Sequence, residues 1–208
     1  VIVPMLRDND EDAALIDYCK GLQGELAALS ACGEPVRALL DLKPVKSTNK
    51  RWGWVKKGAP IVVEVGGRDM AGGNVSVIRR DRLYREDGKL DSAVVAKGEF
   101  VAGGAAMLEE IQHGLFAHAK TRLDGNIVRD VTDLDGVRAF FAEDVKNPGW
   151  VEAGWSKPTG AALDKVVETL KSMKLTLRNV PQGAAPAAGA CLFTGAPAVE
   201  RVIIARAY

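Results

Sequence analysis

The chain has 208 residues, of which 47% are hydrophobic and 26% charged, and its formal net charge is only +1. This balance is that of an ordinary globular protein, and the length allows one large or two small domains. No apolar run approaches the roughly 20 residues of a membrane-spanning helix, and the first residues lack the basic start and long apolar stretch of a signal peptide. Three widely separated cysteines, an odd number, argue against a disulfide framework and favour a reducing compartment, so we expect a cytoplasmic protein.

The first part of the chain predicts one α/β unit. It opens on a β-branched run without an initial Met, which suggests a piece cut from a longer protein. A helix is expected after the polar turn that ends at Asp10, because apolar residues recur there every three or four positions, and Gly33 lies where its C-cap is expected. The other expected elements are strands at 1–6, 36–42, 61–65 and 75–78, a glycine-rich turn at 66–74 and a helix at 98–120.

The pattern restarts after residue 122, which predicts two domains, at 1–122 and 123–208. No internal repeat is present. The elements expected in the second part are helices at 133–146 and 158–173, strands at 149–155, 175–180 and 202–207, and an Ala-, Gly- and Pro-rich loop at 181–190.

The most informative segment is basic and aromatic. From Leu42 to Val63 there are six basic side chains and no Asp or Glu, so the basic charge of this nearly neutral chain is local. Trp52 and Trp54 are interleaved with it. Cations that hold phosphates, beside rings that stack on unpaired bases, are the chemistry of single-stranded nucleic-acid binding. The alternative, that both rings are core residues of a strand, stays open. The six basic residues are Lys43, Lys46, Lys50, Arg51, Lys56 and Lys57.

Arg68 and Asp69 directly follow the strand expected at 61–65. Side chains at the end of a strand project from the edge of the sheet, and this pair suits guanine. An Asp carboxylate accepts both N–H groups of the Watson–Crick edge, and an Arg reaches O6 and N7. From the residues alone, a surface ion pair in a turn is the simpler interpretation.

Other chemistry finds little support in the sequence. The glycines around Arg68 form neither a GxGxxG nor a GxxxxGK[ST] phosphate motif. His113 and His118 lie on a predicted helix with no Cys, Asp or Glu at metal-ligand spacing, so we interpret them as solvated or core-edge histidines. No Ser/His/Asp or Cys/His arrangement supports nucleophilic catalysis. We therefore expect no catalytic residue in this chain.

Several segments together resemble the C-terminal region of class II prolyl-tRNA synthetases, in the archaeal and eukaryotic-like form that some bacteria share. Residues 1–5 look like the opening strand of the anticodon-binding domain, residues 50–60 are similar to its WxxKGxP segment, and residues 63–69 to its VEIGPRD segment. Residues 191–208 resemble the C-terminal domain of that form. The resemblance implies an α/β anticodon-binding domain with a five-stranded mixed sheet and flanking helices, followed by a small α+β domain that in many relatives holds zinc.

The resemblance also implies the binding residues. The anticodon domain of the family reads the two guanines shared by proline anticodons, and Arg68 and Asp69 match the residues that contact them. Val55 and Val62 stand where relatives often carry Glu and Arg, so part of the contact set is missing or supplied elsewhere. The other residues expected to contact tRNA are Trp54, Lys50, Arg51, Lys56 and Lys57.

The second domain departs further from the family. Of the four cysteines expected for zinc, only Cys191 stands at a matching position, Thr194 occupies the place of its partner, and residues 156–161 contain no Cys. We therefore expect no bound metal and a domain that folds without zinc. In similar synthetases the terminal Tyr and its carboxylate reach toward the aminoacylation site, and the same is expected of Tyr208 in the full-length enzyme.

The function that the resemblance implies is recognition of proline tRNA by a fragment of a synthetase that joins proline to its tRNA with ATP and Mg²⁺. The full-length enzyme is expected to be a homodimer, and the fragment, without its catalytic domain, is expected neither to aminoacylate nor to bind DNA or membranes. Two alternatives remain open. One is a non-catalytic RNA-binding or interaction module with the same fold, and the other is a small-molecule α/β enzyme whose glycine turn binds a phosphate.

Overall fold

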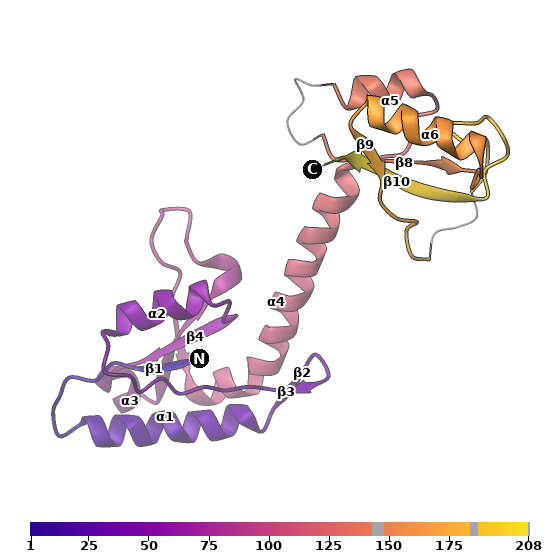
Figure 1. Cartoon of the computed structure of the whole chain (residues 1–208). Helices are drawn as coiled ribbons and strands as arrows, with labels where there is room; N and C mark the ends of the chain where they lie inside the picture. Colours follow the sequence, from indigo (N-terminus) through magenta and orange to yellow (C-terminus); the bar gives the residue numbers. More distant parts are fainter. Residues whose placement is uncertain (143–147, 184–186, 208) are drawn as a thin grey trace. The chain divides into compact units, whose positions relative to one another are not determined.

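The computed structural model describes residues 1–142, 148–183 and 187–207 (Figure 1). The chain divides into two compact units, Val1–Ala117 and His118–Tyr208, which we call unit 1 and unit 2 and describe separately. The division falls within one helix, α4 (Lys97–Gly125), whereas the sequence analysis placed the domain boundary at residue 122. Over the described residues, no helix combines the length and apolar character needed to cross a bilayer.

Unit 1 is built on a four-stranded sheet. Its strands are β1 (Ile2–Pro4), β4 (Ile61–Val65), β5 (Asn74–Arg79) and β6 (Ala93–Ala96), in the spatial order β1-β4-β5-β6. β1 and β4 are parallel and the other neighbours antiparallel, so the sheet is mixed. The strands expected at 61–65 and 75–78 are confirmed. β6 was not predicted, because its four small residues show no alternation.

The sheet has four strands where the resemblance implied five, and residues 36–42, expected as a strand, do not form one. Leu40 makes only an isolated parallel bridge to Ile2. There the N–H of Ile2 donates to the carbonyl of Leu39 at 2.7 Å, and the N–H of Asp41 donates to the carbonyl of Ile2 at 2.9 Å. β1 is only three residues long, which limits any ladder along this edge.

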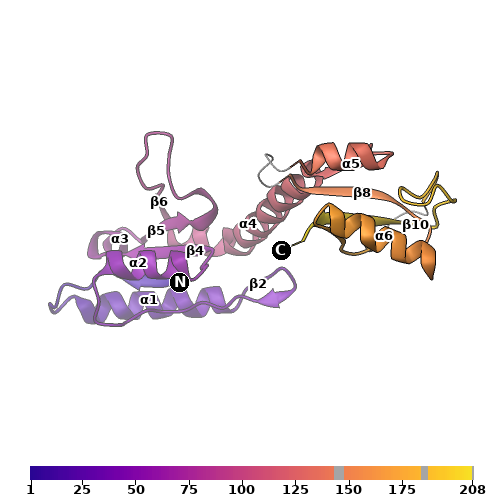
Figure 2. The ribbon, with the colours of Figure 1, turned by 45° about the horizontal axis from the view of Figure 1, so that its top comes forward.

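Helices cover both faces of this sheet (Figure 2). α1 (Asp12–Ala27) and α4 pack against one face, and α2 (Ser47–Lys56) packs against the other. Side chains alternate along a strand, so Val63 of β4 lies in the core beneath α1, whereas Val62 lies in a smaller cluster with Trp54 and Val55 of α2. A short helix, α3 (Gly67–Ala71), follows β4 where a glycine-rich turn was expected.

The first predicted helix is confirmed as α1, but its ends differ from the prediction. The N-cap residue is Glu11 and not Asp10, and no side chain caps this end. Gly33 is not a C-cap, because the helix ends earlier; with φ of +79° it forms the turn between the short strands β2 (Ser30–Ala31) and β3 (Glu34–Pro35). The periodic residues do form the buried face of the helix: they are Leu15, Cys19, Leu22 and Leu26.

Unit 2 is an α+β unit on a second four-stranded sheet. Its strands, in the spatial order β7-β8-β10-β9, are β7 (Ile127–Val128), β8 (Trp150–Trp155), β10 (Glu200–Arg206) and β9 (Leu175–Leu177). Its helices are α5 (Leu134–Phe140) and α6 (Ala161–Ser172). The core joins Val137 of α5 and Leu170 of α6 to Val151 and Ile204 of the sheet.

Three elements of unit 2 are shorter than predicted. The helix expected at 133–146 ends at Phe140, and residues 143–147 lie outside the described part of the chain. The helix expected at 158–173 begins only at Ala161, because Gly160 has φ of +55°. The strand expected at 175–180 ends at Leu177. Among the described residues of the loop expected at 181–190, none belongs to a helix or strand.

Candidate nucleic-acid interface

The basic segment forms helix α2, not a strand. Gly58, with φ of +89°, follows its C-cap and lets the chain reverse into β4. α2 therefore runs antiparallel to β4, and its first turns lie near the carboxyl end of that strand. The three- and four-residue spacing of Arg51, Trp54 and Val55 places these side chains toward the sheet.

An ion pair ties α2 to the sheet. The guanidinium of Arg51 donates from Nε at 2.9 Å and from Nη2 at 2.7 Å to the two carboxylate oxygens of Glu64 in β4. Only 16% of the Arg51 side chain and 8% of the Glu64 side chain are exposed. A bidentate pair of this kind has a fixed, planar geometry. Arg51, which the sequence analysis assigned to tRNA, is thus engaged within the fold.

A second anchor of α2 is the buried carboxylate of Asp41. It accepts hydrogen bonds from Nε1 of Trp54 at 2.6 Å and from the backbone N–H of Lys43 at 3.0 Å. The ammonium of Lys50, itself buried, donates to the backbone carbonyl of Asp41 at 3.0 Å. Burial alone would raise the pKa of Asp41, but the Trp54 and Lys43 hydrogen bonds and the charges of Lys50 and Lys43 outweigh it and lower the pKa. Lys50 and Trp54 therefore have structural partners.

Two acids flank the acid-free stretch in the sequence, Asp41 before it and Glu64 after it. In the folded chain both accept hydrogen bonds from residues of α2. Lys57 is exposed, and its Nζ lies 4.5 Å from the centroid of the Trp54 ring, a cation–π contact. Beside it lies a pocket of about 160 Å³ lined by Asp41, Lys43, Val45, Asn49, Lys50, Gly53, Trp54 and Lys57. The basic side chains left exposed along the segment are Lys43, Lys46, Lys56 and Lys57.

Arg68 and Asp69 lie on α3, at the carboxyl end of β4. Arg68 is exposed, and in the described part of the chain its guanidinium has no hydrogen-bond partner. Asp69 is half-buried, and its Oδ2 accepts a hydrogen bond from the N–H of Gly66 at 2.8 Å, which caps the start of α3. Its other oxygen, Oδ1, accepts no hydrogen bond from the described residues. Asp69 therefore caps the helix with one oxygen only, and its second oxygen is left without a hydrogen bond from the described residues.

The structure does not gather all the predicted residues at one point. Lys56 and Lys57 end α2 and lie near the amino end of β4, whereas Arg68 and Asp69 follow its carboxyl end. Five residues of strand span roughly 16 Å. The residues predicted to contact tRNA are therefore spread along an elongated surface, with Arg68 and Asp69 at one end of β4 and the lysines at the other.

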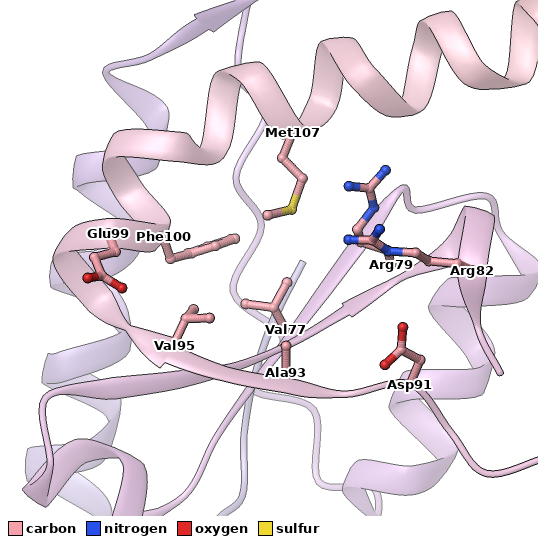
Figure 3. A pocket seen from close by; sticks show the side chains of 9 residues that line it. All are labelled: Val77, Arg79, Arg82, Asp91, Ala93, Val95, Glu99, Phe100 and Met107. Carbon is pink, nitrogen blue, oxygen red and sulfur yellow. The ribbon is translucent and has the colours of Figure 1, made fainter. Parts of the chain in front are cut away.

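Another pocket of unit 1 lies apart from this surface, between β5, β6 and α4 (Figure 3). Its volume is about 240 Å³ and its floor is apolar, formed by Val77, Val95 and Phe100. Arg79 at its edge is bound to Asp81 at 2.8 Å and to Glu110 at 2.6 Å. Its remaining lining residues are Arg82, Asp91, Ala93, Glu99 and Met107.

Cys191 in unit 2 is buried in a polar setting. Burial would raise the pKa of its thiol, but hydrogen bonds from the hydroxyls of Ser156 and Thr194 and from the backbone of Phe193 and Thr194 lower the pKa to about 7. The two hydroxyl oxygens are 3.0 Å apart. One thiol and two hydroxyls do not fit structural zinc, which takes four Cys or His ligands. Within the described ranges, no three His, Cys, Asp or Glu side chains are grouped as metal ligands.

Of the remaining candidate residues, the structure describes the two histidines but not the terminal tyrosine. His113 and His118 are exposed on α4. Tyr208 lies outside the described residues. Sequence reasoning missed Asp41, whose only signal is a lone acid in the apolar run at 36–42, and Tyr84, whose ring stacks on Trp52.

Comparison with known proteins places this geometry in context. Residues 1–96 match the family model described as "Anticodon binding domain". The chain is 71% identical to a proline–tRNA ligase of Sphingomonas elodea, 64% identical to one of Sphingopyxis alaskensis and 57% identical to one of Novosphingobium aromaticivorans. Each match covers 100% of this chain but only 41%, 39% and 40% of the respective relative.

The chain thus spans about two fifths of the length of these curated relatives. The relatives come from bacteria, so the archaeal and eukaryotic-like form stays a prediction. Along its whole length this chain is similar to part of proline–tRNA ligases, and its first 96 residues match the anticodon binding domain family.

Proposed function

We propose that this chain is the tRNA-binding region of a proline–tRNA ligase, and that unit 1 reads the guanines of the proline anticodon. The observation that carries the proposal is the match of residues 1–96 to the anticodon binding domain, within a chain 71% identical to a proline–tRNA ligase over its whole length. The geometry of α3 supports it. Among the residues that the structure describes, Arg68 is exposed without a hydrogen-bond partner, and the neighbouring Asp69 has one carboxylate oxygen that accepts no hydrogen bond.

Asp69 and Arg68 recognise guanine by complementary donors and acceptors in this proposal. Guanine offers two adjacent N–H donors on its Watson–Crick edge, and one carboxylate oxygen has lone pairs for both. The Arg68 fork supplies donors for O6 and N7 of a guanine. Lys56 and Lys57 hold phosphates, while Lys50, Arg51 and Trp54 act on tRNA by fixing α2 in place.

In this proposal the whole enzyme joins proline to its tRNA in the cytoplasm, with ATP and Mg²⁺. In that enzyme the partners of this region are proline tRNA, the catalytic domain and a second copy of the chain. Unit 2 is proposed to be the small C-terminal domain with a degenerate zinc site, which ends on Tyr208 directed toward the aminoacylation site.

The proposal is tested by changing Asp69 without removing the helix cap. Asp69→Asn keeps a carbonyl oxygen for the N–H of Gly66 but replaces the other oxygen with an N–H₂ group, which faces guanine donors with a donor. We expect Asp69→Asn to reduce the preference for proline tRNA, over a transcript with both anticodon guanines replaced, by about 5- to 150-fold with little change in melting temperature. Asp69→Ala should lose the same preference and also about 0.5–2 kcal/mol of stability.

Asp135→Asn is the matched control, because it removes the same charge from an exposed site on α5 of unit 2. Binding is measured by fluorescence anisotropy of labelled transcripts at fixed salt. A wild-type chain that bound both transcripts equally would refute anticodon recognition. An unchanged preference in Asp69→Asn would refute only the role of Asp69.

A further inference from the structure

A stacked aromatic pair lies beside the basic helix. The rings of Trp52 on α2 and Tyr84 in the loop between β5 and β6 have centroids 6.2 Å apart and planes inclined by 21°. Trp52 is half-buried, whereas Tyr84 is 59% exposed. One face of the Tyr84 ring lies against Trp52, so its other face is open to solvent. In the described part of the chain, neither the indole N–H nor the phenol has a hydrogen-bond partner.

The loop that carries Tyr84 is fixed to α2 and to the sheet. Nε of Arg80 donates to the backbone carbonyl of Val55 in α2 at 3.2 Å. Tyr84 forms an antiparallel bridge with Leu90 across the loop. Leu83 and Leu90 pack into the small apolar cluster beneath α2. The ring is therefore held in position before any ligand arrives, which limits the entropy lost on binding.

Basic residues lie near Tyr84 along its loop and on α2. Lys56 is four residues after Trp52 on α2, so both lie on the same side of the helix, and Lys56 is exposed. Arg85 follows Tyr84 in the sequence and is exposed as well, whereas Arg82 lines the pocket between β5, β6 and α4. Four acids belong to the same loop: Asp81 is bound to Arg79, Asp87 lies 3.5 Å from Lys89, Glu86 is exposed, and Asp91 lines the pocket between β5, β6 and α4.

We infer that the open face of Tyr84, backed by Trp52, is a stacking site for an unpaired nucleobase of the bound tRNA. The inference rests on the proposed function and adds a contact to it that is distinct from Arg68 and Asp69. An exposed ring with cations beside it matches both parts of an unpaired nucleotide, the flat base and the phosphate. Stacking accepts any base, so this site adds affinity without reading sequence.

The test separates the aromatic face from the space that the side chain fills. Tyr84→Leu fills much of the same volume without a ring, whereas Tyr84→Phe keeps the ring and loses only the hydroxyl. We expect Tyr84→Leu and Tyr84→Ala to weaken binding of proline tRNA by about 5- to 150-fold, and Tyr84→Phe to bind within about twofold of wild type. Phe116→Ala, which removes another exposed ring from α4, is the matched control.

Two further readouts identify the kind of contact. Because a stacked base carries no net charge, Tyr84→Leu should leave the slope of log Kd against log salt unchanged, whereas Lys56→Ala should reduce it by about one. Each anticodon-loop nucleotide can also be replaced in turn by an abasic one. We expect one position, not a guanine, at which loss of the base weakens binding to wild type and Tyr84→Leu then weakens it no further.

The outcomes distinguish this inference from the proposed function. If wild type prefers the guanine-bearing transcript and Tyr84→Leu, with an unchanged melting temperature, binds as wild type does, the stacking site is refuted and anticodon recognition stands. Equal weakening in Tyr84→Phe and Tyr84→Leu would also refute it. If wild type shows no guanine preference but Tyr84→Leu still weakens binding, the stacking site stands and anticodon recognition fails.

Discussion

Asp41 shows how one buried side chain organises a basic segment. Its carboxylate accepts from Trp54 and from the backbone of Lys43, and its backbone carbonyl accepts from Lys50. The pKa of Asp41 is lowered in the folded state from its ordinary value of 3.8. Because the folded pKa is the lower one, the stability that the ionised group contributes is full above pH 3.8 and is lost as pH falls through the folded pKa.

We expect Asp41→Asn to lower the free energy of unfolding by about 1.5–3 kcal/mol at neutral pH, since a hydrogen-bonded charge is replaced by a neutral amide. The difference from wild type should shrink as pH falls below 3.8, because the carboxylate is protonated first in the unfolded chain and only at lower pH in the folded one. Denaturant titrations over a range of pH measure both. Asp17→Asn, an exposed carboxylate on α1 paired with Lys20, is the control and should change stability little. A difference that did not depend on pH would contradict the assignment.

Cys191 should titrate near neutral pH, because the pKa of its thiol is lowered from 9.0 to about 7. The pKa of Cys19 is raised by burial to about 11, so Cys19 does not interfere, and Cys32→Ser removes the exposed thiol. Ultraviolet absorbance of the thiolate then reports Cys191 alone. Thr194→Val should raise its pKa by removing a hydrogen-bond donor. Folded-state stability relative to Cys191→Ser should rise between pH 7 and pH 9, because the unfolded thiol still binds its proton there. A titration centred near 9 in the folded protein would refute this.

At the scale of elements, α2 depends on the Arg51–Glu64 pair. Removing one partner leaves a largely buried charge, so Arg51→Met or Glu64→Leu alone should cost about 3–5 kcal/mol of folding free energy. The double variant Arg51→Met/Glu64→Leu should cost much less than the sum, since no buried charge is left unpaired. Thermal and denaturant unfolding of wild type, the two single variants and the double variant measure these free energies.

Binding of tRNA to the same double variant decides the role of Arg51. If Arg51 only positions α2, a folded double variant should retain the guanine preference of wild type and most of its affinity. A selective loss of affinity in the folded double variant would restore Arg51 as a direct contact. The control is Lys20→Met/Asp17→Leu, which removes an exposed pair from α1.

Periodicity predicted the elements that bury a continuous apolar face. α1, α4, β4 and β5 follow from it because three- and four-residue or two-residue spacing reports one buried side. α2 could not be found in this way, since its sheet-facing positions include the charged Arg51 and its sequence is polar on average. The burial of Lys50 depends on Asp41, nine residues away, and becomes visible only once the chain between them is folded.

The candidate site was predictable only in part for the same reason. The position of Arg68 and Asp69 after β4 follows from the strand pattern, because residues after a buried strand emerge at the sheet edge. The capping role of Asp69 does not, since the sequence suggested a turn and not helix α3. Tyr84 escaped attention because its partner Trp52 is 32 positions away along the printed sequence, and nothing local marks the pair.

At the scale of the whole molecule, each unit has its own apolar core. Unit 2 places Cys191 among hydroxyls and packs its sheet against α5 and α6. We therefore expect the melting temperature to be unchanged by a chelator and by added zinc, because one thiolate cannot hold a structural zinc ion. Metal analysis of protein purified without added metal accompanies the melting curves. Stoichiometric zinc that is lost together with structure on chelation would overturn this expectation.

The two anchors of α2, Glu64 from the strand beneath it and Asp41 beside it, have a consequence for the thermodynamics of association. A helix held at both places is already ordered before RNA arrives, so no segment of α2 has to fold as the complex forms. Coupled folding produces a large negative heat-capacity change and an entropic cost. Without coupled folding, the enthalpy of association comes from the contacts between protein and RNA. The rate of encounter is then set by diffusion and charge.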